Sequence, residues 1–264
     1  NKPTENMKVK VGSRSDIGLV RQSNQDVALD LVAPYAPLEA ECLMIVADGM
    51  GGHAAGEVAS SIAVDELVKT ISSSSVKNPD VGLILKESVT HANAAVYEAG
   101  KLPENRGMGT TLTAALVVKS KLYVANVGDS RCYLLRNGKL KQITEDHSFV
   151  SEKVRSGELT PEEARNHPYR NVITRAIGLD LLVKVDIFTE TLSDKDSILL
   201  CSDGLYPLVS DVDIIEILTN NKPPVACDRL IAKANAHGGN DNITVAIGIV
   251  EKKGSRNRST GRTC

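Results

Sequence analysis

Four aspartates mark the ends of apolar runs in this sequence. Asp48, Asp129 and Asp203 each follow such a run, and Asp241 stands just before one. Aspartate is a poor strand residue and is rarely buried unless it is paired or binds a metal. One such aspartate usually belongs to a turn, but four at the strand ends of one sheet system favour a metal site. Carboxylates without cysteine or clustered histidine suit Mg²⁺ or Mn²⁺ rather than zinc.

A glycine-rich loop follows the first of these aspartates. Residues 48–53 read DGMGGH and lead into a predicted helix. Glycine lets the backbone approach a ligand closely, and a helix N-terminus favours an anion, although the loop lacks the lysine of a nucleotide P-loop. The Gly49 carbonyl could therefore join the coordination shell of a metal. His53 would lie close by, and we expect a catalytic role for it, although a lone histidine is more often structural.

An arginine and a further aspartate stand near the start of the chain. Arg21 precedes Asp26 by five residues in the segment RQSNQD. On a continuous strand this spacing places the two side chains on opposite faces, so a bulge or turn is needed for both to reach one site. Arginine is the natural partner of a phosphate, which it binds in bidentate fashion. The alternative is a surface arginine and an unrelated strand-end aspartate.

The elements that must position these residues begin with a series of apolar, strand-like runs. Short polar links predict hairpins between 111–118 and 122–127 and, around Asn137-Gly138, between 132–136 and 139–143. We also expect 183–189 to pair with 197–201. A run buried on both faces is predicted at 43–47, and 243–250 closes the series. The sheets should therefore be mostly antiparallel.

Amphipathic helices alternate with these strands. Val64, Leu67, Val68 and Ile71 follow helical spacing, and Asn78 caps a second helix with Pro79 in its first turn. Two more are predicted at 210–218 and 225–234. Helices with one apolar face suit both outer faces of paired sheets. We expect an α+β fold, a four-layer αββα sandwich of two mostly antiparallel sheets flanked by helices. It would form one catalytic domain over 7–251, with 252–264 as a basic tail or linker.

Residues 148–170, called the flap segment below, are polar and charged. They contain Thr160-Pro161-Glu162-Glu163, a capping box with proline at its start. Long connections of this kind are often functional lids. We expect a flap over the cleft; the alternative is a solvated excursion without a role.

Composition excludes several classes of protein. The chain has 264 residues, of which 42% are hydrophobic and 24% charged, as in globular proteins. No apolar run approaches the ~18 residues of a membrane span. The net charge is −2, and the last thirteen residues hold five basic and no acidic side chains, so the rest of the chain is acidic. An acidic body with few aromatic side chains argues against nucleic acid as a partner. Five widely spaced cysteines without a C-x-x-C pair suggest buried, reduced thiols in a cytoplasmic protein.

Seven segments, in order along the chain, are Arg21–Asp26 (RQSNQD), Val46–Glu57 (VADGMGGHAAGE), Gly109–Thr111 (GTT), Asn126–Arg131 (NVGDSR), Asn171–Gly178 (NVITRAIG), Leu199–Leu205 (LLCSDGL) and Gly238–Val245 (GGNDNITV). Together they resemble the metal-dependent PPM family of serine/threonine phosphatases, the protein phosphatase 2C type, in its bacterial form. Each alone is a weak signal, but the set is specific and spans about residues 10–250. The family's αββα sandwich agrees with the fold expected from the strands and helices.

The resemblance implies a set of metal ligands. Asp48 would bridge two metals, Mn²⁺ or Mg²⁺, and Gly49 would contribute its carbonyl to the second. Asp203 and Asp241 would hold the first metal, and Asp26 would act on the second through water.

The same resemblance implies a third, weaker metal held by Asp129 with Asp203, and it assigns the catalytic roles. Arg21 would grip the substrate phosphate, and His53 would protonate the leaving seryl or threonyl oxygen. A water activated at the dinuclear centre would attack phosphorus in line, without a phosphoenzyme. Implied partners are phosphorylated serine/threonine proteins, a serine/threonine kinase among them, and we expect a monomer.

Two other functions stay open. A metal-dependent hydrolase of small phosphoesters would use the same ligands, and the flap segment is the best discriminator. A non-catalytic module that binds phosphoproteins is disfavoured by the complete aspartate set. One departure from the family lies beside a predicted ligand, where Tyr206-Pro207 follow Asp203-Gly204-Leu205. Another is Gln25, which replaces a glutamate of many eukaryotic relatives.

Overall fold

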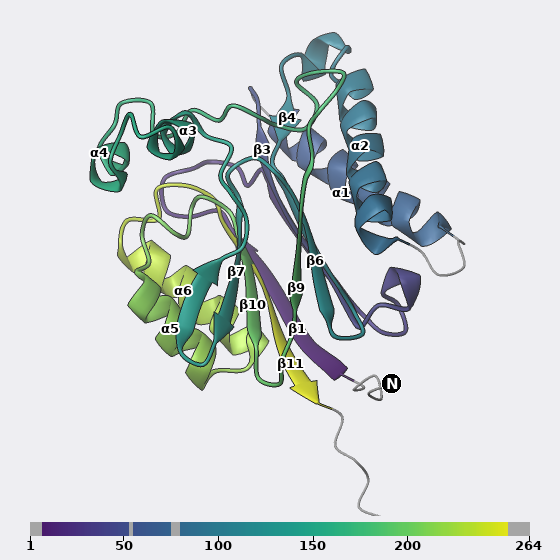
Figure 1. Cartoon of the computed structure of the whole chain (residues 1–264). Coiled ribbons are helices and arrows are strands. Elements are labelled where there is room, and N and C mark those ends of the chain that lie inside the picture. Colours follow the sequence, from purple (N-terminus) through teal and green to yellow (C-terminus); the bar gives the residue numbers. More distant parts are fainter. Residues whose placement is uncertain (1–6, 53–54, 75–79, 253–264) are drawn as a thin grey trace, which may run out of the picture.

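Two β-sheets lie face to face between two pairs of helices in the computed structural model, which describes residues 7–52, 55–74 and 80–252 (Figure 1). One sheet has the order β1 (Met7–Asp16), β11 (Ile243–Lys252), β10 (Ser197–Cys201), β7 (Arg131–Arg136) and β8 (Lys139–Gln142). The other has the order β2 (Asp26–Val32), β3 (Cys42–Met50), β5 (Leu112–Val118), β6 (Lys121–Val127) and β9 (Asp186–Thr191), and β4 (Gly109–Thr110) pairs with the end of β3. All described strand pairs are antiparallel.

The helices cover the outer faces of both sheets. The pair α1 (Ala55–Ser73) and α2 (Val81–Ala99) packs on the sheet that contains β3, and α5 (Asp211–Asn220) and α6 (Pro223–Ala236) pack on the other. Short 3₁₀ turns lie at Pro37–Glu39 and Pro103–Asn105. The expected α+β four-layer αββα sandwich is confirmed.

The alternation of side chains along β3 explains why it is apolar throughout. Leu43 and Ile45 lie in the hydrophobic cluster beneath α1 and α2, whereas Met44 and Val46 lie in the cluster between the sheets. Successive strand residues point to opposite faces, and both faces of β3 are covered. A continuous aliphatic run is therefore required here, as the sequence indicated.

Most local elements match their predictions. The β7–β8 hairpin turns at Asn137 and Gly138, with φ of 50° and 72°, the left-handed pair that such a two-residue turn requires. The Thr160 capping box is present, and Ser210 caps α5. The capping residue of α2 is Asp80, whose side chain accepts from the Leu83 N–H at 3.1 Å; the predicted cap at Asn78-Pro79 lies outside the described residues.

The predicted pairing of 183–189 with 197–201 is wrong. The first of these strands, β9, begins at Asp186 and pairs with β6, whereas β10 lies between β11 and β7 in the opposite sheet. Between them the chain crosses from one sheet to the other, and Lys195 adopts a φ of 66° in this crossing. An apolar run shows that a strand is buried, but it does not show which strand is its neighbour.

Four of the five cysteines lie in the described part of the chain, and these four behave as predicted. Cys42, Cys132, Cys201 and Cys227 are buried and free. Burial raises the pKa of Cys42 and of Cys201 to about 12, so neither supplies a thiolate near neutral pH. Among the described residues, no helix is both long and apolar enough to cross a membrane.

Candidate active site

The predicted aspartates meet at one end of the sandwich, the end that carries β4 in Figure 1. Asp26 opens β2 and lies opposite Asp48 on β3 in the antiparallel register. Asp129 follows β6, Asp203 follows β10, and Asp241 precedes β11. The ligands expected along one sheet system thus come from both sheets, and we call these five residues the aspartate cluster.

Burial and mutual repulsion raise the pKa values of Asp26, Asp48, Asp129 and Asp203. Burial is the main cause for Asp26, whose pKa rises to about 6, and for Asp129, whose pKa rises to about 7; the charge of Asp203 adds to both. Burial also raises the pKa of Asp48 well above its usual range, and the charges of Asp26 and Asp203 raise it further. Burial and then the charge of Asp241 raise the pKa of Asp203. A divalent cation bound among these carboxylates would offset both the cost of burying their charges and the repulsion between them.

Two oxygens of the cluster lack partners. Asp26 Oδ1 and Asp203 Oδ1 are buried and form no hydrogen bond with the described part of the chain. A buried carboxylate oxygen without a donor is costly, and hard oxygens of this kind are the ligands that Mg²⁺ and Mn²⁺ prefer. In the described ranges, no three His, Cys, Asp or Glu side chains form a closed ligand set. The cluster therefore fits a hard cation by charge and donor type, and some ligand movement would complete the shell.

Two glycines allow the close backbone approaches on which the cluster depends. A Cβ at Gly49 would lie 2.1 Å from Gly56 O and 2.5 Å from Gln25 O, and one at Gly204 would lie 1.9 Å from Asn242 O. Because these neighbours are backbone atoms, they cannot move aside for a side chain. The Asp-Gly pairs at 48–49 and 203–204 thus let neighbouring strands and α1 come together at the site. The role of the Gly49 carbonyl as a metal ligand stays a prediction.

Arg21 lies in the loop between β1 and β2 and not on a strand. The expectation that Arg21 and Asp26 would point to opposite faces of one strand therefore does not apply. Its Nη2 donates to Asp241 Oδ2 at 2.6 Å, and this hydrogen bond raises its pKa. The side chain is about half exposed, at 54%. A guanidinium thus stands at the solvent edge of the aspartate cluster. The candidate proton donor His53 lies outside the described residues.

Asn242 was missed by the sequence analysis, although it holds the loop of Arg21 in place. Its Oδ1 accepts from the Gln25 N–H at 2.9 Å, and its Nδ2 donates to the carbonyls of Ile17 and Ser23, both at 3.0 Å. The side chain is buried. An asparagine directly after Asp241 was the available signal, but the sequence alone does not say which backbone groups it satisfies.

Ser202 was also missed, and it joins the two sheets below the cluster. Its Oγ donates to Asp26 Oδ2 at 2.8 Å and accepts from the Thr244 N–H at 3.0 Å. Asp26 is thereby tied to the strands that carry Asp203. The small polar residue before that aspartate was the only sequence signal.

Tyr206, which departs from the family pattern, has a structural role. The ring of Tyr206 lies under the guanidinium of Arg131, 3.5 Å from ring centroid to Cζ, and its hydroxyl donates to Asp129 O at 3.2 Å. Arg131 also binds Asp146 in bidentate fashion, at 3.0 and 2.7 Å. Cation–π and charge-assisted contacts of this kind are strong when they are partly buried. The tyrosine is therefore part of the support of Asp129.

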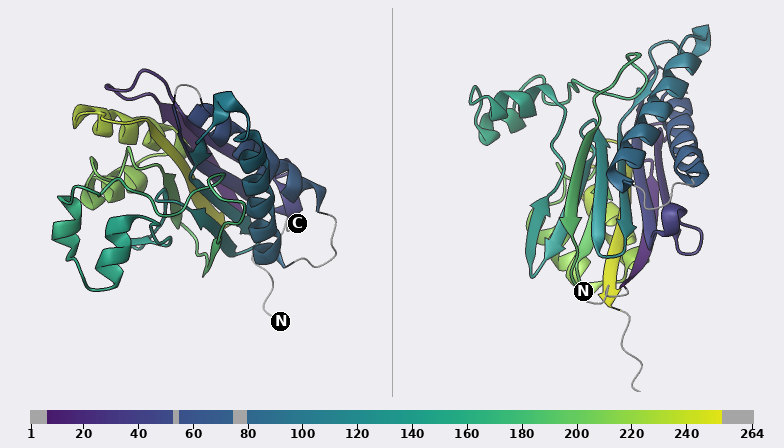
Figure 2. Two further views of the ribbon diagram at one scale, coloured as in Figure 1. Left: turned by 90° about the horizontal axis from the view of Figure 1, so that it is seen from above. Right: turned by 45° about the vertical axis from the view of Figure 1, so that its right-hand side comes forward.

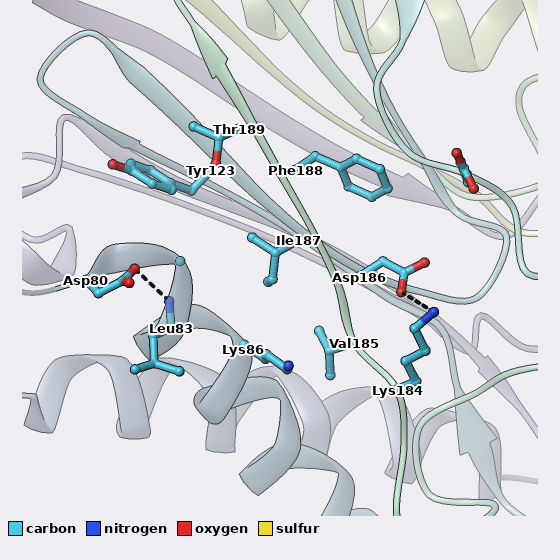
Figure 3. A pocket seen from close by; sticks show the side chains of 12 residues that line it. Asp80, Leu83, Lys86, Tyr123, Lys184, Val185, Asp186, Ile187, Phe188 and Thr189 are labelled. Atoms are coloured by element: carbon cyan, nitrogen blue, oxygen red, sulfur yellow. Dashed lines mark hydrogen bonds and ion pairs between the residues drawn. The ribbon is translucent and has the colours of Figure 1, made fainter.

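A separate groove lies away from the cluster, between the start of α2 and the edge strand β9 (Figure 3). It measures about 670 Å³, and Lys86 and Lys184 line it together with Asp80 and Asp186. Its charges are mixed, and no member of the aspartate cluster contributes to it. The groove is thus not the candidate site for metal chemistry.

The raised pKa values predict how pH affects the metal-free protein. Asp26 and Asp129 bind protons up to about pH 6 and 7 in the folded state, but only to about pH 3.9 when unfolded. Their stabilising contribution is complete below the unfolded value and is lost as pH rises through the folded values. We expect the Tm in chelator to fall between pH 5.5 and 7.5, and Mn²⁺ to reverse that fall. Thermal unfolding by circular dichroism measures both.

Asp129→Asn should flatten this pH dependence, because it removes one of the titrating groups. Asp228→Asn is the matched control, since that carboxylate is 63% exposed. A metal-free Tm that rises over the same interval would contradict the assignment.

Comparisons with known proteins give a consistent result. A family model described as protein phosphatase 2C matches residues 15–243. The serine/threonine phosphatase stp of Listeria welshimeri is 40% identical over 239 residues, which cover 89% of this chain and 93% of that protein. The Mycobacterium tuberculosis serine/threonine phosphatase PstP/Ppp superposes with a TM-score of 0.82 at 39% identity, covering 92% of this chain and 99% of that one. A PstP catalytic domain in complex with two manganese ions gives a TM-score of 0.81 at 37% identity, with coverage of 94% and 100%.

Proposed function

Because the chain belongs to the protein phosphatase 2C family and is a serine/threonine phosphatase, we propose that the aspartate cluster is its active site and hydrolyses phosphoserine and phosphothreonine. The observation that carries this proposal is the set of buried, mutually repelling carboxylates, two of which have an unpartnered oxygen. An arrangement so costly in the folded chain is expected where a divalent cation binds.

We assign the metal ligands as the resemblance implies. Asp48, Asp203 and Asp241 would hold the two tightly bound cations, with Gly49 through its carbonyl and Asp26 through water. Asp129 would hold a third, weaker one together with Asp203. The PstP domain bound to two manganese ions supports Mn²⁺, and Mg²⁺ suits the same donors. When bound, such a cation supplies Lewis acidity, which lowers the pKa of water and stabilises charge on the phosphoryl group.

The protein's own side chains supply binding and proton transfer. Arg21 stands where its guanidinium can bind a phosphate beside Asp241, and Asn242 fixes the loop that carries it. Water attacks phosphorus in line, and the leaving seryl or threonyl oxygen takes a proton, for which we retain His53 as the donor. All four described thiols are buried, which agrees with a reaction that forms no cysteinyl phosphate.

We also propose which proteins this phosphatase acts on, where it acts and where its catalytic domain ends. The substrates are phosphorylated serine/threonine proteins, and a serine/threonine kinase is expected among them. We further propose that the protein acts as a monomer in the cytoplasm, that 7–251 forms the catalytic domain, and that 252–264 is a basic tail or linker.

One assay separates a protein phosphatase from a hydrolase of small phosphoesters. Mn²⁺-dependent phosphate release is measured from a phosphothreonine peptide, a phosphotyrosine peptide and a nucleoside monophosphate. We expect the phosphothreonine peptide to give the highest kcat/KM. A preference for the nucleotide would overturn the proposal, and binding of the phosphopeptide without turnover would indicate the non-catalytic module.

The flap segment supports a protein substrate, because it stands out beside the active-site end of the sandwich (Figure 2). It contains α3 (Phe149–Arg155) and α4 (Pro161–Arg165), and the ring of Phe149 contacts those of His167 and Tyr169 at centroid distances of 5.6 and 5.7 Å. These aromatic contacts hold together a segment that otherwise buries little apolar surface.

Phe149→Ala is therefore expected to lower kcat/KM for the phosphothreonine peptide by about tenfold. Hydrolysis of 4-nitrophenyl phosphate should change less than about twofold, because this small ester needs only the metal centre. Tyr35→Ala, at a tyrosine that is 80% exposed, is the control. Equal effects on both substrates, or no effect on either, would show that the flap segment has no role in substrate binding.

A further inference from the structure

His147 is buried at the base of the flap segment, outside the aspartate cluster. Only 2% of the residue is exposed. Its N–H donates to Gly128 O at 3.0 Å, and its Nδ1 accepts from the Gly128 N–H, also at 3.0 Å. One histidine thus binds both backbone groups of the residue that precedes Asp129.

The other ring nitrogen faces the opposite direction. Nε2 lies 2.9 Å from Asp186 Oδ2 at the start of β9, and 2.9 Å from Arg175 Nη1. Because Nδ1 accepts a hydrogen bond, the ring proton must lie on Nε2, from which it is donated to Asp186. Arg175 Nη1 donates to Asp186 Oδ1 at 3.1 Å. Figure 3 shows Asp186 where β9 begins, next to Lys184.

Both ends of the flap segment meet at this histidine. Ser148 follows it directly and forms a bridge with Ile173, and the His147 carbonyl accepts from the Thr174 N–H at 2.9 Å. The chain therefore leaves and re-enters the sandwich at one point, and the imidazole lies beneath that point.

Gly128 cannot adjust independently of its surroundings. Its φ is +107°, and a Cβ there would lie 2.6 Å from Thr111 Cβ. The direction in which the chain leaves β6 toward Asp129 is therefore fixed at this residue, and two of the hydrogen bonds that fix it come from His147.

We propose that His147 is a positioning residue that couples the base of the flap segment to the Asp129 loop, so that flap order and cation binding at Asp129 change together. The imidazole is rigid, and its two nitrogens lie on opposite sides of the ring, so a displacement on one side is transmitted to the other. This inference rests on the proposed function where it concerns the cation, but the coupling itself is a property of the metal-free chain.

Three substitutions separate the two contacts. His147→Ala removes both. His147→Asn keeps an acceptor close to the position of Nδ1, and His147→Gln places an amide donor close to that of Nε2. Hydrogen–deuterium exchange is followed in 126–131 and in 149–172, with and without Mn²⁺, and Mn²⁺ binding is titrated by calorimetry. The exposed His91 on α2 provides the control His91→Ala.

In the alanine variant we expect exchange to be at least about tenfold faster in both segments, and the weakest Mn²⁺ site to lose about fivefold or more in affinity. The asparagine variant should restore protection and Mn²⁺ affinity at 126–131 alone, and the glutamine variant should restore protection of 149–172 alone. If the alanine variant does not fold, Asp186→Ala removes the outer partner but keeps the imidazole, so exchange should become faster in 149–172 and, through His147, also in 126–131.

The coupling would be overturned if exchange in both segments stays within twofold of wild type. It would also be overturned if the asparagine and glutamine variants both behave like the alanine variant, as a purely structural histidine would. A wild-type protein that binds no Mn²⁺ would contradict the proposed function instead, because the exchange pattern of the metal-free chain still decides the coupling.

Discussion

Asp203→Asn is expected to lower phosphatase activity by at least about 10³-fold, and Asp241→Asn should do the same. Each change removes one anionic oxygen from a site built of carboxylates, and the loss of several kcal/mol of metal-dependent stabilisation corresponds to that factor. Asp203 is affected most directly, because its Oδ1 is buried and unpartnered. Steady-state hydrolysis of a phosphothreonine peptide with Mn²⁺ measures the loss, and calorimetric titration measures the accompanying fall in Mn²⁺ affinity.

The same substitution should stabilise the metal-free protein. Burial and the charge of Asp241 raise the pKa of Asp203, so its charged form is unfavourable in the folded chain at pH 7. A neutral isostere removes that cost, and the Tm in chelator should rise while activity disappears. Asp65→Asn, at an exposed position on α1, should change neither quantity. Unchanged Mn²⁺ affinity in both Asp203→Asn and Asp241→Asn would exclude them as ligands.

The sequence predicted those elements whose local pattern has one physical explanation. The run at β3 is aliphatic because both of its faces are covered, and Asn137-Gly138 supplies the two left-handed residues of a hairpin. In both cases the signal lies within a few residues, so no knowledge of distant partners is required.

Strands whose pattern mixes polar and apolar residues were not predicted. β1 reads MKVKVGSRSD, and its exposed positions carry lysine, arginine and serine, because it lies at the edge of its sheet. The pairings of β9 and β10 failed for a related reason. Strand neighbours are set by contacts between segments far apart in the chain. The apolar pattern within one strand does not show which distant segment pairs with it.

The aspartate cluster was predictable because carboxylates are unusual at the ends of buried strands. Its supports were not: Asn242, Ser202 and His147 are polar residues that serve many structural purposes, and their partners are mostly backbone groups. Residue type alone reveals a charged ligand, but it does not reveal which amide or carbonyl a neutral side chain will satisfy.

Arg21→Ala is expected to raise KM for the phosphothreonine peptide by about 10- to 100-fold and to change kcat much less. A hydrogen bond to a charged group is worth roughly 1.5–3 kcal/mol, and a guanidinium that binds the phosphate in both the ground state and the transition state contributes mainly to binding. Steady-state kinetics with saturating Mn²⁺ separate the two parameters. Arg14→Ala is a matched control, because that arginine is also about half exposed and paired with an aspartate, Asp228.

The ion pair with Asp241 makes a second interpretation of Arg21 testable in the same experiment. If the guanidinium acts only by neutralising Asp241, its removal alters Mn²⁺ affinity and leaves KM unchanged at saturating metal. Arg21→Lys keeps the charge but lacks the planar fork that binds a phosphate through two N–H groups. Under the phosphate-binding role, lysine should therefore recover only part of the affinity for the peptide. Full recovery by lysine, or a fall confined to kcat, would show that Arg21 does not bind the substrate phosphate in the way proposed.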